Sequence, residues 1–358
     1  MIETVRVEPA RVAAYHRLLL RTAGRLPDEL TAEARRWLAD GDVLGVAQAV
    51  TFAALAGRIA LTPADADLLA ATLAEAGADA DAVAALERSE TEGQGWFGLA
   101  PVGPDVLATY GDEVPYSLDL TAGYDGPGGA DPTDEAVRAA VSGGEVAGVA
   151  ILGVWRSFRF PARDTRWPAP RRVYLVQAAT ADDAVLVPVA PALQDALAAA
   201  GEAHPQVEVF AEPGALPAFQ RTALGFGALL WAPAPAEPIR VARLFDSDGP
   251  VVPAGRDGLS GEERDRVLGY LDAGAPLLIS PNHTEDVADP ARGAVVPVAF
   301  HTDGRWIWPE ASAYYLAEHG IAPDADLLAD IRAAGYRAPE VDAVSVHRAL
   351  TRLYRDSR

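Results

Sequence analysis

Residues 149–178 read VAILGVWRSFRFPARDTRWPAPRRVYLVQA and decide how the middle of the chain folds. Two runs rich in β-branched and aromatic residues, 149–160 and 172–178, stand on either side of a proline-rich segment. Runs of this kind predict two strands joined by a loop. Further strand and helix patterns surround them over residues 112–234 and indicate a sheet covered by helices.

The same stretch is strongly basic. Six arginines stand against one acid, Asp164, between Trp155 and Tyr174, so the local net charge is +5 in a chain whose net charge is −21. Guanidinium groups bind carboxylates and phosphates in pairs of hydrogen bonds and stack on aromatic rings. The hairpin could therefore hold an anionic ligand, a nucleotide or an acidic protein segment. Alternatively, its arginines pair with acids of neighbouring segments and its aromatic rings fill the core. The residues that we expect to bind a ligand or partner here are Arg156, Arg159, Arg163, Arg166 and Trp167.

Helical patterns alone occupy residues 1–90. Val12, Tyr15 and Leu19 recur at the spacing of one helix face. Thr62 followed by Pro63 is typical of a helix start, because a hydroxyl caps the first turn and proline tolerates its first position. Short glycine-marked connections between the helices predict a compact helical bundle.

The rest of the chain divides at two segments rich in glycine or proline. We expect a linker over residues 91–111, an α/β domain with the arginine hairpin over 112–234, and a stiff joint at Pro233, Pro235 and Pro238. A last α/β domain, 238–358, contains a hairpin across residues 302–304 and ends in three helices, at 310–319, 324–334 and 341–355. The predicted fold class is α+β, an N-terminal helical bundle followed by two mixed α/β sheet domains.

Composition excludes several kinds of chemistry. The 358 residues include no cysteine, and all 30 basic residues are arginine. Disulfides, thiolate metal sites and Schiff-base catalysis are therefore excluded. No Gly-x-Ser-x-Gly turn of the hydrolase type occurs. We expect no cofactor and no metal, and these exclusions favour a protein that is not an enzyme.

The net charge bears on partners and location. A charge of −21 and a pI near 4.6 repel nucleic acid and anionic membranes and attract a basic partner. The alternative is that the acidity only reflects the composition of a high-GC genome. No apolar stretch reaches the roughly 20 residues that cross a bilayer, and the N-terminus lacks a basic start to a signal peptide. We therefore expect a cytoplasmic protein with a protein partner, binding neither nucleic acid nor membrane.

The C-terminal part offers an alternative site. Residues 280–286 read SPNHTED, and a histidine and an acid follow on the next hairpin. Histidine and carboxylate side chains could act as a general base or hold a metal, although their spacing matches no metal motif. The candidate catalytic residues in this alternative are His283, Asp286, His301 and Asp303. Trp306 and Trp308, in the same hairpin, are of the residue type that anchors protein interfaces.

Three stretches carry a resemblance. Residues 15–21 (YHRLLLR), 205–210 (PQVEVF) and 302–308 (TDGRWIW) resemble those of a family of uncharacterised actinobacterial proteins, from which no activity or catalytic residue carries over. In its acidity and its tryptophans in hairpins, the chain is similar to immunity proteins that neutralise secreted toxins.

Two functional hypotheses follow. The first is an intracellular protein-binding module, either a toxin-neutralising (immunity-type) antitoxin or a regulatory partner protein. The alternative is a small-molecule enzyme or ligand-binding protein that holds an anionic ligand on the arginine hairpin and uses the histidine and aspartate site of the C-terminal domain.

Overall fold

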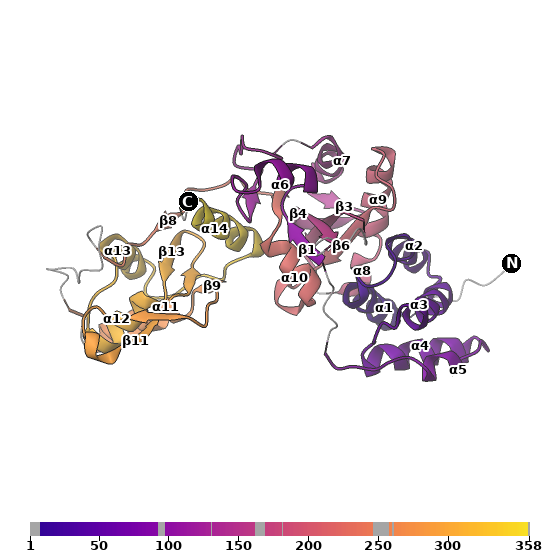
Figure 1. Cartoon of the computed structure of the whole chain (residues 1–358), viewed down its shortest axis with the longest axis horizontal. Coiled ribbons are helices and arrows are strands. Elements are labelled where there is room, and N and C mark those ends of the chain that lie inside the picture. Colours follow the sequence, from indigo (N-terminus) through magenta and orange to yellow (C-terminus); the bar gives the residue numbers. More distant parts are fainter. Residues whose placement is uncertain are drawn as a thin grey trace. The chain divides into compact units, whose positions relative to one another are not determined.

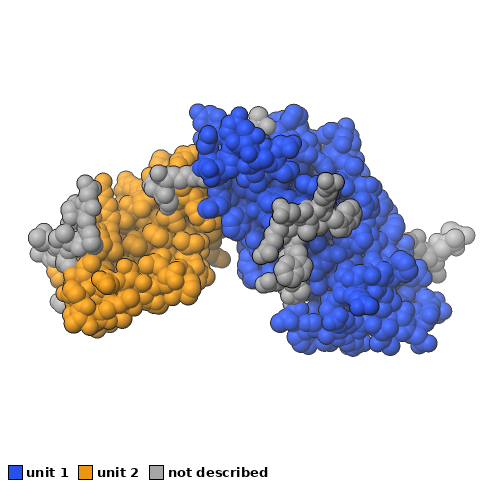
Figure 2. Space-filling model, viewed as in Figure 1, with its two compact units in different colours: residues 1–235 blue, residues 236–358 orange. Residues whose placement is uncertain are grey.

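The structure, a computed structural model, describes residues 8–91, 97–129, 131–161, 169–180, 182–245, 258–259 and 261–356. The chain forms two compact units, residues 1–235 and 236–358 (Figures 1 and 2). The boundary falls at the proline-rich joint. The fold class is α+β, as predicted. The helices of the N-terminal part and the arginine hairpin belong to the same unit, whereas the sequence suggested separate domains, because α2 and α1 pack on elements of the sheet region.

Five helices open the first unit: α1 (Pro9–Thr22), α2 (Asp28–Ala39), α3 (Val43–Gly57), α4 (Pro63–Glu75) and α5 (Asp81–Ala84). Apolar residues at helical spacing, among them Tyr15, Leu19 and Leu69, are buried together in their core. The predicted start of α4 is confirmed, because the Thr62 hydroxyl accepts a hydrogen bond from the Asp65 amide at 3.1 Å. The helical N-terminal region is therefore as predicted.

A seven-stranded sheet lies in the described part of the first unit. Its strands are β1 (Phe97–Ala100), β2 (Leu118–Asp119), β3 (Glu145–Val146), β4 (Val149–Pro161), β5 (Arg171–Ala178), β6 (Gln206–Phe210) and β7 (Ala228–Trp231). The main order is β2-β7-β4-β5-β6, and β1 and β3 also pair with β4. The predicted hairpin of β4 and β5 is confirmed as an antiparallel pair at the centre of this order.

Helices cover both faces of this sheet (Figure 1). The further helices of the unit are α6 (Pro104–Tyr110), α7 (Pro132–Val141), α8 (Asp183–Leu186), α9 (Val189–Ala199), α10 (Ala218–Gly225) and the short η1 (Pro213–Ala215). Residues of α7 and α9 share one core with Val154, Tyr174 and Val207. On the opposite face, Glu208 of β6 contacts α2 and α10, as strand alternation requires.

The segment expected to be a linker, 91–111, contains β1 and α6. The strand β1 pairs with the end of β4, with Gly98 opposite Phe160. A Cβ atom on Gly98 would lie only 2.6 Å from the Phe160 ring, so this glycine permits the close approach of a large side chain. Gly98, one of the glycines that suggested a linker, therefore serves strand pairing.

The second unit is built around a four-stranded sheet of order β8-β13-β12-β9 and a separate β10–β11 pair. Its elements are β8 (Arg240–Val241), α11 (Gly261–Asp272), β9 (Ala275–Leu278), β10 (His283–Glu285), η2 (Pro290–Arg292), β11 (Ala294–Pro297), β12 (Phe300–Thr302), β13 (Trp306–Pro309), α12 (Ala311–His319), α13 (Ala325–Ala333) and α14 (Ala343–Asp356). The predicted hairpin across 302–304 and the three final helices are confirmed. Gly304 has a φ of 87°, which the tight turn requires.

Among the described helices, none combines the length and the apolar character that crossing a bilayer requires.

Candidate functional site

The arginine hairpin presents its side chains alternately to the two faces of the sheet. In the register of β4 and β5, Phe158 lies opposite Arg172 and Arg159 lies opposite Arg171. Arg156 therefore shares a face with Arg172, and Arg159 points the other way. A cavity adjoins each face. Arg163, Arg166 and Trp167, three of the residues expected to bind, lie outside the described residues.

The first cavity, which we call the acidic cavity, has a volume of about 350 Å³. This is at the small end of the range for ligand pockets. It lies between the start of α6, the start of α7 and the hairpin. The side chains that give it its character are Asp105, Asp131, Arg156, Phe158, Arg172 and Glu202.

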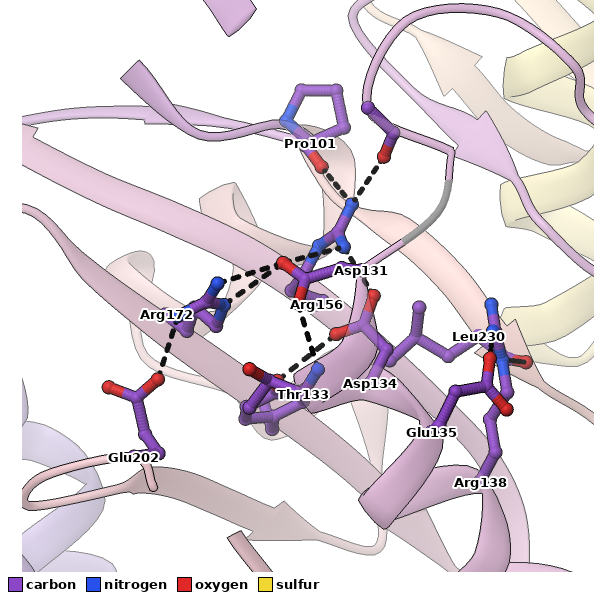
Figure 3. Close-up of polar contacts among 12 residues, drawn as sticks. Pro101, Asp131, Thr133, Asp134, Glu135, Arg138, Arg156, Arg172, Glu202 and Leu230 are labelled. Atoms are coloured by element: carbon purple, nitrogen blue, oxygen red, sulfur yellow. Dashed lines mark hydrogen bonds and ion pairs between the residues drawn. The ribbon is translucent and has the colours of Figure 1, made fainter. Parts of the chain in front are cut away.

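Arg156 forms the floor of the acidic cavity and is only 1% exposed. It is ion-paired with the fully buried Asp134 and donates to the carbonyl oxygens of Pro101 at 2.8 Å and Gly128 at 3.3 Å (Figure 3). Burial raises the pKa of the Asp134 carboxyl, while the charge of Arg156 opposes that rise. Burial and the neighbouring Asp134 raise the pKa of Tyr174, which donates to Asp134 at 3.0 Å. Arg156 thus ties three chain segments to the sheet.

Arg172 bridges two carboxylates at the wall of the acidic cavity. Its guanidinium donates to Asp131 at 2.9 Å and to Glu202 at 2.8 Å (Figure 3). Burial acts to raise the pKa of Asp131, but hydrogen bonds from Arg172 and from the Thr133 amide outweigh it and leave that pKa below its usual value.

The charge of the acidic cavity is negative although it contains two arginines of the hairpin. Arg156 and Arg172 lie 5.1 and 5.3 Å from the centre of the Phe158 ring. Four carboxylates surround them, so the local net charge is −2. These carboxylates are Asp105, Asp131, Asp134 and Glu202. Among the described residues, the positive charge of the two hairpin arginines on this face is therefore more than offset.

The second cavity, on the opposite face, has a volume of about 680 Å³. We call it the apolar cavity, because the following side chains from the α1–α2 connection, α2 and α3 form much of its wall: Leu26, Leu30, Phe52, Ala53, Ala56 and Ile59. Arg159 donates to both oxygens of Asp28, at 2.9 and 2.7 Å, and Arg171 donates to the same carboxylate at 3.3 Å. The hairpin arginines thus fasten β4 and β5 to the start of α2.

No pattern in the sequence marks Asp28 as a partner of these arginines or Phe52 as part of a cavity wall. Asp28 and Arg159 are 131 residues apart, and an acid in the first turn of a helix is ordinary. Asp131, directly before Pro132, is typical only of a helix start.

The structure does not bring the four histidine and aspartate candidates of the second unit together. His283 is exposed on β10, and the His301 ring lies 3.2 Å from the Gly274 carbonyl oxygen and stacks on Trp308. Asp303 accepts hydrogen bonds from Tyr270 at 2.6 Å and from two backbone amides of its own turn. In the described part of this unit, no hydrogen bond or ion pair joins any two of the four candidates.

Asp286 is instead bonded to a histidine that the sequence did not connect with it. Its buried carboxylate lies 2.7 Å from His319 Nε2 and accepts from the Tyr314 hydroxyl at 2.9 Å. Burial acts to raise the pKa of Asp286, but hydrogen bonds from His319 and Tyr314 lower it to about 2. The same carboxylate accepts from the Ala288 and Asp289 amides, so it fixes the loop after β10 onto α12. Among the described residues, no group of three or more histidines and acids is placed to hold a metal ion.

Trp306 and Trp308, expected to anchor a partner, are core residues of the second unit. They are 4% and 0% exposed and pack with Val267, Leu316 and Ile331. The Trp306 indole donates to Asp330 at 2.7 Å. Their rings therefore stabilise the unit and do not face a partner in the folded chain.

Comparison of the chain with models of protein families, with curated proteins and with solved structures gives no match. The family resemblance expected from the sequence therefore stays a prediction.

Proposed function

We propose that this chain is a cytoplasmic protein-binding module whose partner is a basic protein, and that the partner docks over the acidic cavity. A module that neutralises a toxin and one that regulates another protein both fit this description. The observation that carries the proposal is the charge of the acidic cavity, where four carboxylates surround two arginines.

The rest of the first unit supports the same kind of partner. Residues 1–235 contain 31 acids and 17 arginines, a net charge of −14. Such a field accelerates the approach of a positively charged protein, and salt weakens the effect. At the cavity itself, Asp105 is exposed and Arg172 is 28% exposed, so a lysine or arginine of the partner can reach carboxylates that Arg172 now holds.

The alternative of an enzyme with an anionic substrate has less support. In the acidic cavity, Arg156 and Arg172 are each paired with carboxylates, which an anion at the same atoms would have to displace. Of the histidine and aspartate candidates, Asp286, His301 and Asp303 are bonded to other groups, and His283 is exposed.

The test starts with purification of the full chain from its source cells at low salt, followed by identification of the proteins that accompany it. The identified partner is then titrated against the wild type, against Asp105→Asn/Glu202→Gln, and against the control Glu33→Gln/Glu90→Gln. The control removes two exposed charges of the same unit away from the cavity.

We expect a basic partner whose affinity falls as salt rises, and about tenfold weaker binding by the cavity variant than by the control. A neutral or acidic partner, binding that does not depend on salt, or equal binding by the two variants would each contradict the proposal.

A further inference from the structure

We propose that the apolar cavity binds a small amphiphile, an apolar chain or ring that ends in a carboxylate. This site lies on the face of the hairpin opposite the acidic cavity and goes beyond the binding of a basic protein. Three features of its wall lead to this assignment: its apolar surface, its charge, and a buried donor without an acceptor.

The apolar surface is large and partly open. The cavity volume of about 680 Å³ falls well inside the range of small-molecule sites, and those sites are mostly apolar with a few polar groups at one end. Phe52 belongs to the wall and is 76% exposed, which is unusual for a large apolar side chain next to a cavity. A ligand with an apolar body would cover this ring and remove it from water.

The charged end of the cavity is positive. Arg159 and Arg171 share the single carboxylate of Asp28, which leaves one positive charge over. Glu29 comes only within 4.0 Å of Arg171, and its side chain is 55% exposed, so solvent screens this contact. A ligand carboxylate would bring these charges into balance.

Among the described residues, the buried Nε atom of Arg159 has no hydrogen-bond partner, although both terminal nitrogens of this side chain are bonded to Asp28. Arg159 is 2% exposed and belongs to the cavity wall. A buried donor without an acceptor costs free energy that a nearby anionic oxygen recovers. A carboxylate supplies such an oxygen, whereas a cationic head group would meet the guanidinium groups of Arg159 and Arg171.

The experiment compares two amphiphiles with the same tail and opposite head charge. Decanoate and decyltrimethylammonium, both below their micelle-forming concentrations, are titrated into the full chain by calorimetry. Ala56→Trp places a large ring in the apolar wall at an exposed position. Ala71→Trp, at an exposed position of α4 outside the cavity, is the matched control, and Arg171→Met removes one guanidinium while Arg159 keeps its pair with Asp28.

We expect saturable binding of decanoate, about tenfold or more tighter than that of decyltrimethylammonium. Ala56→Trp abolishes it, Ala71→Trp leaves it within about twofold, and Arg171→Met weakens it about tenfold. The proposal is overturned if decanoate does not bind the wild type, if both amphiphiles bind alike, or if Ala56→Trp binds as the control does. A basic protein partner would be unaffected by these results, so the two proposals fail separately.

Discussion

Single residues of this chain show how burial sets charge. His16 lies on α1 against β6, is 7% exposed, and donates from Nε2 to the Val209 carbonyl oxygen at 3.0 Å. Burial lowers the pKa of His16 to about 4, so the ring is neutral near pH 7. In the unfolded chain the same ring has its ordinary pKa near 6.5.

This difference makes stability depend on pH. Between pH 6.5 and 4, His16 is protonated in the unfolded chain and neutral in the folded chain. The contribution of neutral His16 to the stability of the folded chain is therefore complete above pH 6.5 and is lost as the pH falls towards 4. We expect the free energy of unfolding to fall by about 3 kcal/mol more for the wild type than for His16→Gln between pH 7 and pH 4. Urea unfolding at a series of pH values measures this, and equal losses would show that the folded state accepts the proton.

At this scale the sequence identified the arginines but not their acids. Local composition reveals Arg156, Arg159 and Arg172 as members of a basic cluster. Their partners come from helix starts at distances of 22, 131 and 41 residues along the chain, and no local pattern marks a long-range ion pair. The prediction that His283, Asp286, His301 and Asp303 form one site rested on their nearness in sequence. The fold does not bring these four side chains together.

At the scale of elements, a buried polar group joins helices to the sheet. Glu208 of β6 accepts from Arg35 of α2 at 2.6 Å and from Gln220 of α10 at 2.8 Å. Glu208 and Arg35 are 1% and 6% exposed, and Gln220 also donates to the Leu20 carbonyl oxygen of α1. One strand residue thus holds three helices.

Removing the charge of Glu208 should therefore destabilise the first unit strongly. In Glu208→Gln the guanidinium of Arg35 stays buried without a counter-charge, which costs about 3–5 kcal/mol. The control is Glu75→Gln, which breaks an exposed, solvent-screened pair with Arg11 and should cost far less. Midpoints of urea unfolding distinguish the two, and similar losses would contradict a buried role for Glu208.

Elements with strong local signals were predicted well. Thr62 and Pro63 mark the start of α4, and the turn before Gly304 marks the hairpin of β12 and β13. The segment 91–111 was harder, since glycine is typical both of linkers and of strands that a large ring approaches closely. The Phe160 ring beside Gly98 shows that this part of the segment is a strand and not a linker.

The whole molecule contains two units with separate cores. One core of the first unit joins α7, α9 and the sheet, and the core of the second surrounds Trp306 and Trp308. Residues 236–358 contain 20 acids and 13 arginines, a net charge of −7, so both units are acidic. The proline-rich joint lies at the division between the two units, but no local signal showed that the helical N-terminal part is joined to the sheet by long-range contacts.

We expect residues 236–358 to fold when expressed alone. This fragment contains two of the seven tryptophans, Trp306 and Trp308, and both are buried in its own core. Its fluorescence emission should be that of buried indoles and should shift to longer wavelength in one cooperative step as urea is added. Emission typical of water-exposed indole in native buffer would show that the core does not form without the rest of the chain.

The alternation of arginines along β4 and β5 also protects the alignment of these strands. If β5 slid by a single position against β4, Arg171 and Arg172 would exchange sides of the sheet. In this shifted alignment, Asp28 would lose its contact with Arg171, and Asp131 would lose its contact with Arg172. Each arginine would then lie on the side of the sheet away from its carboxylate. Ion pairs on both sides of the sheet therefore favour the observed register of β4 and β5 over the register shifted by one residue.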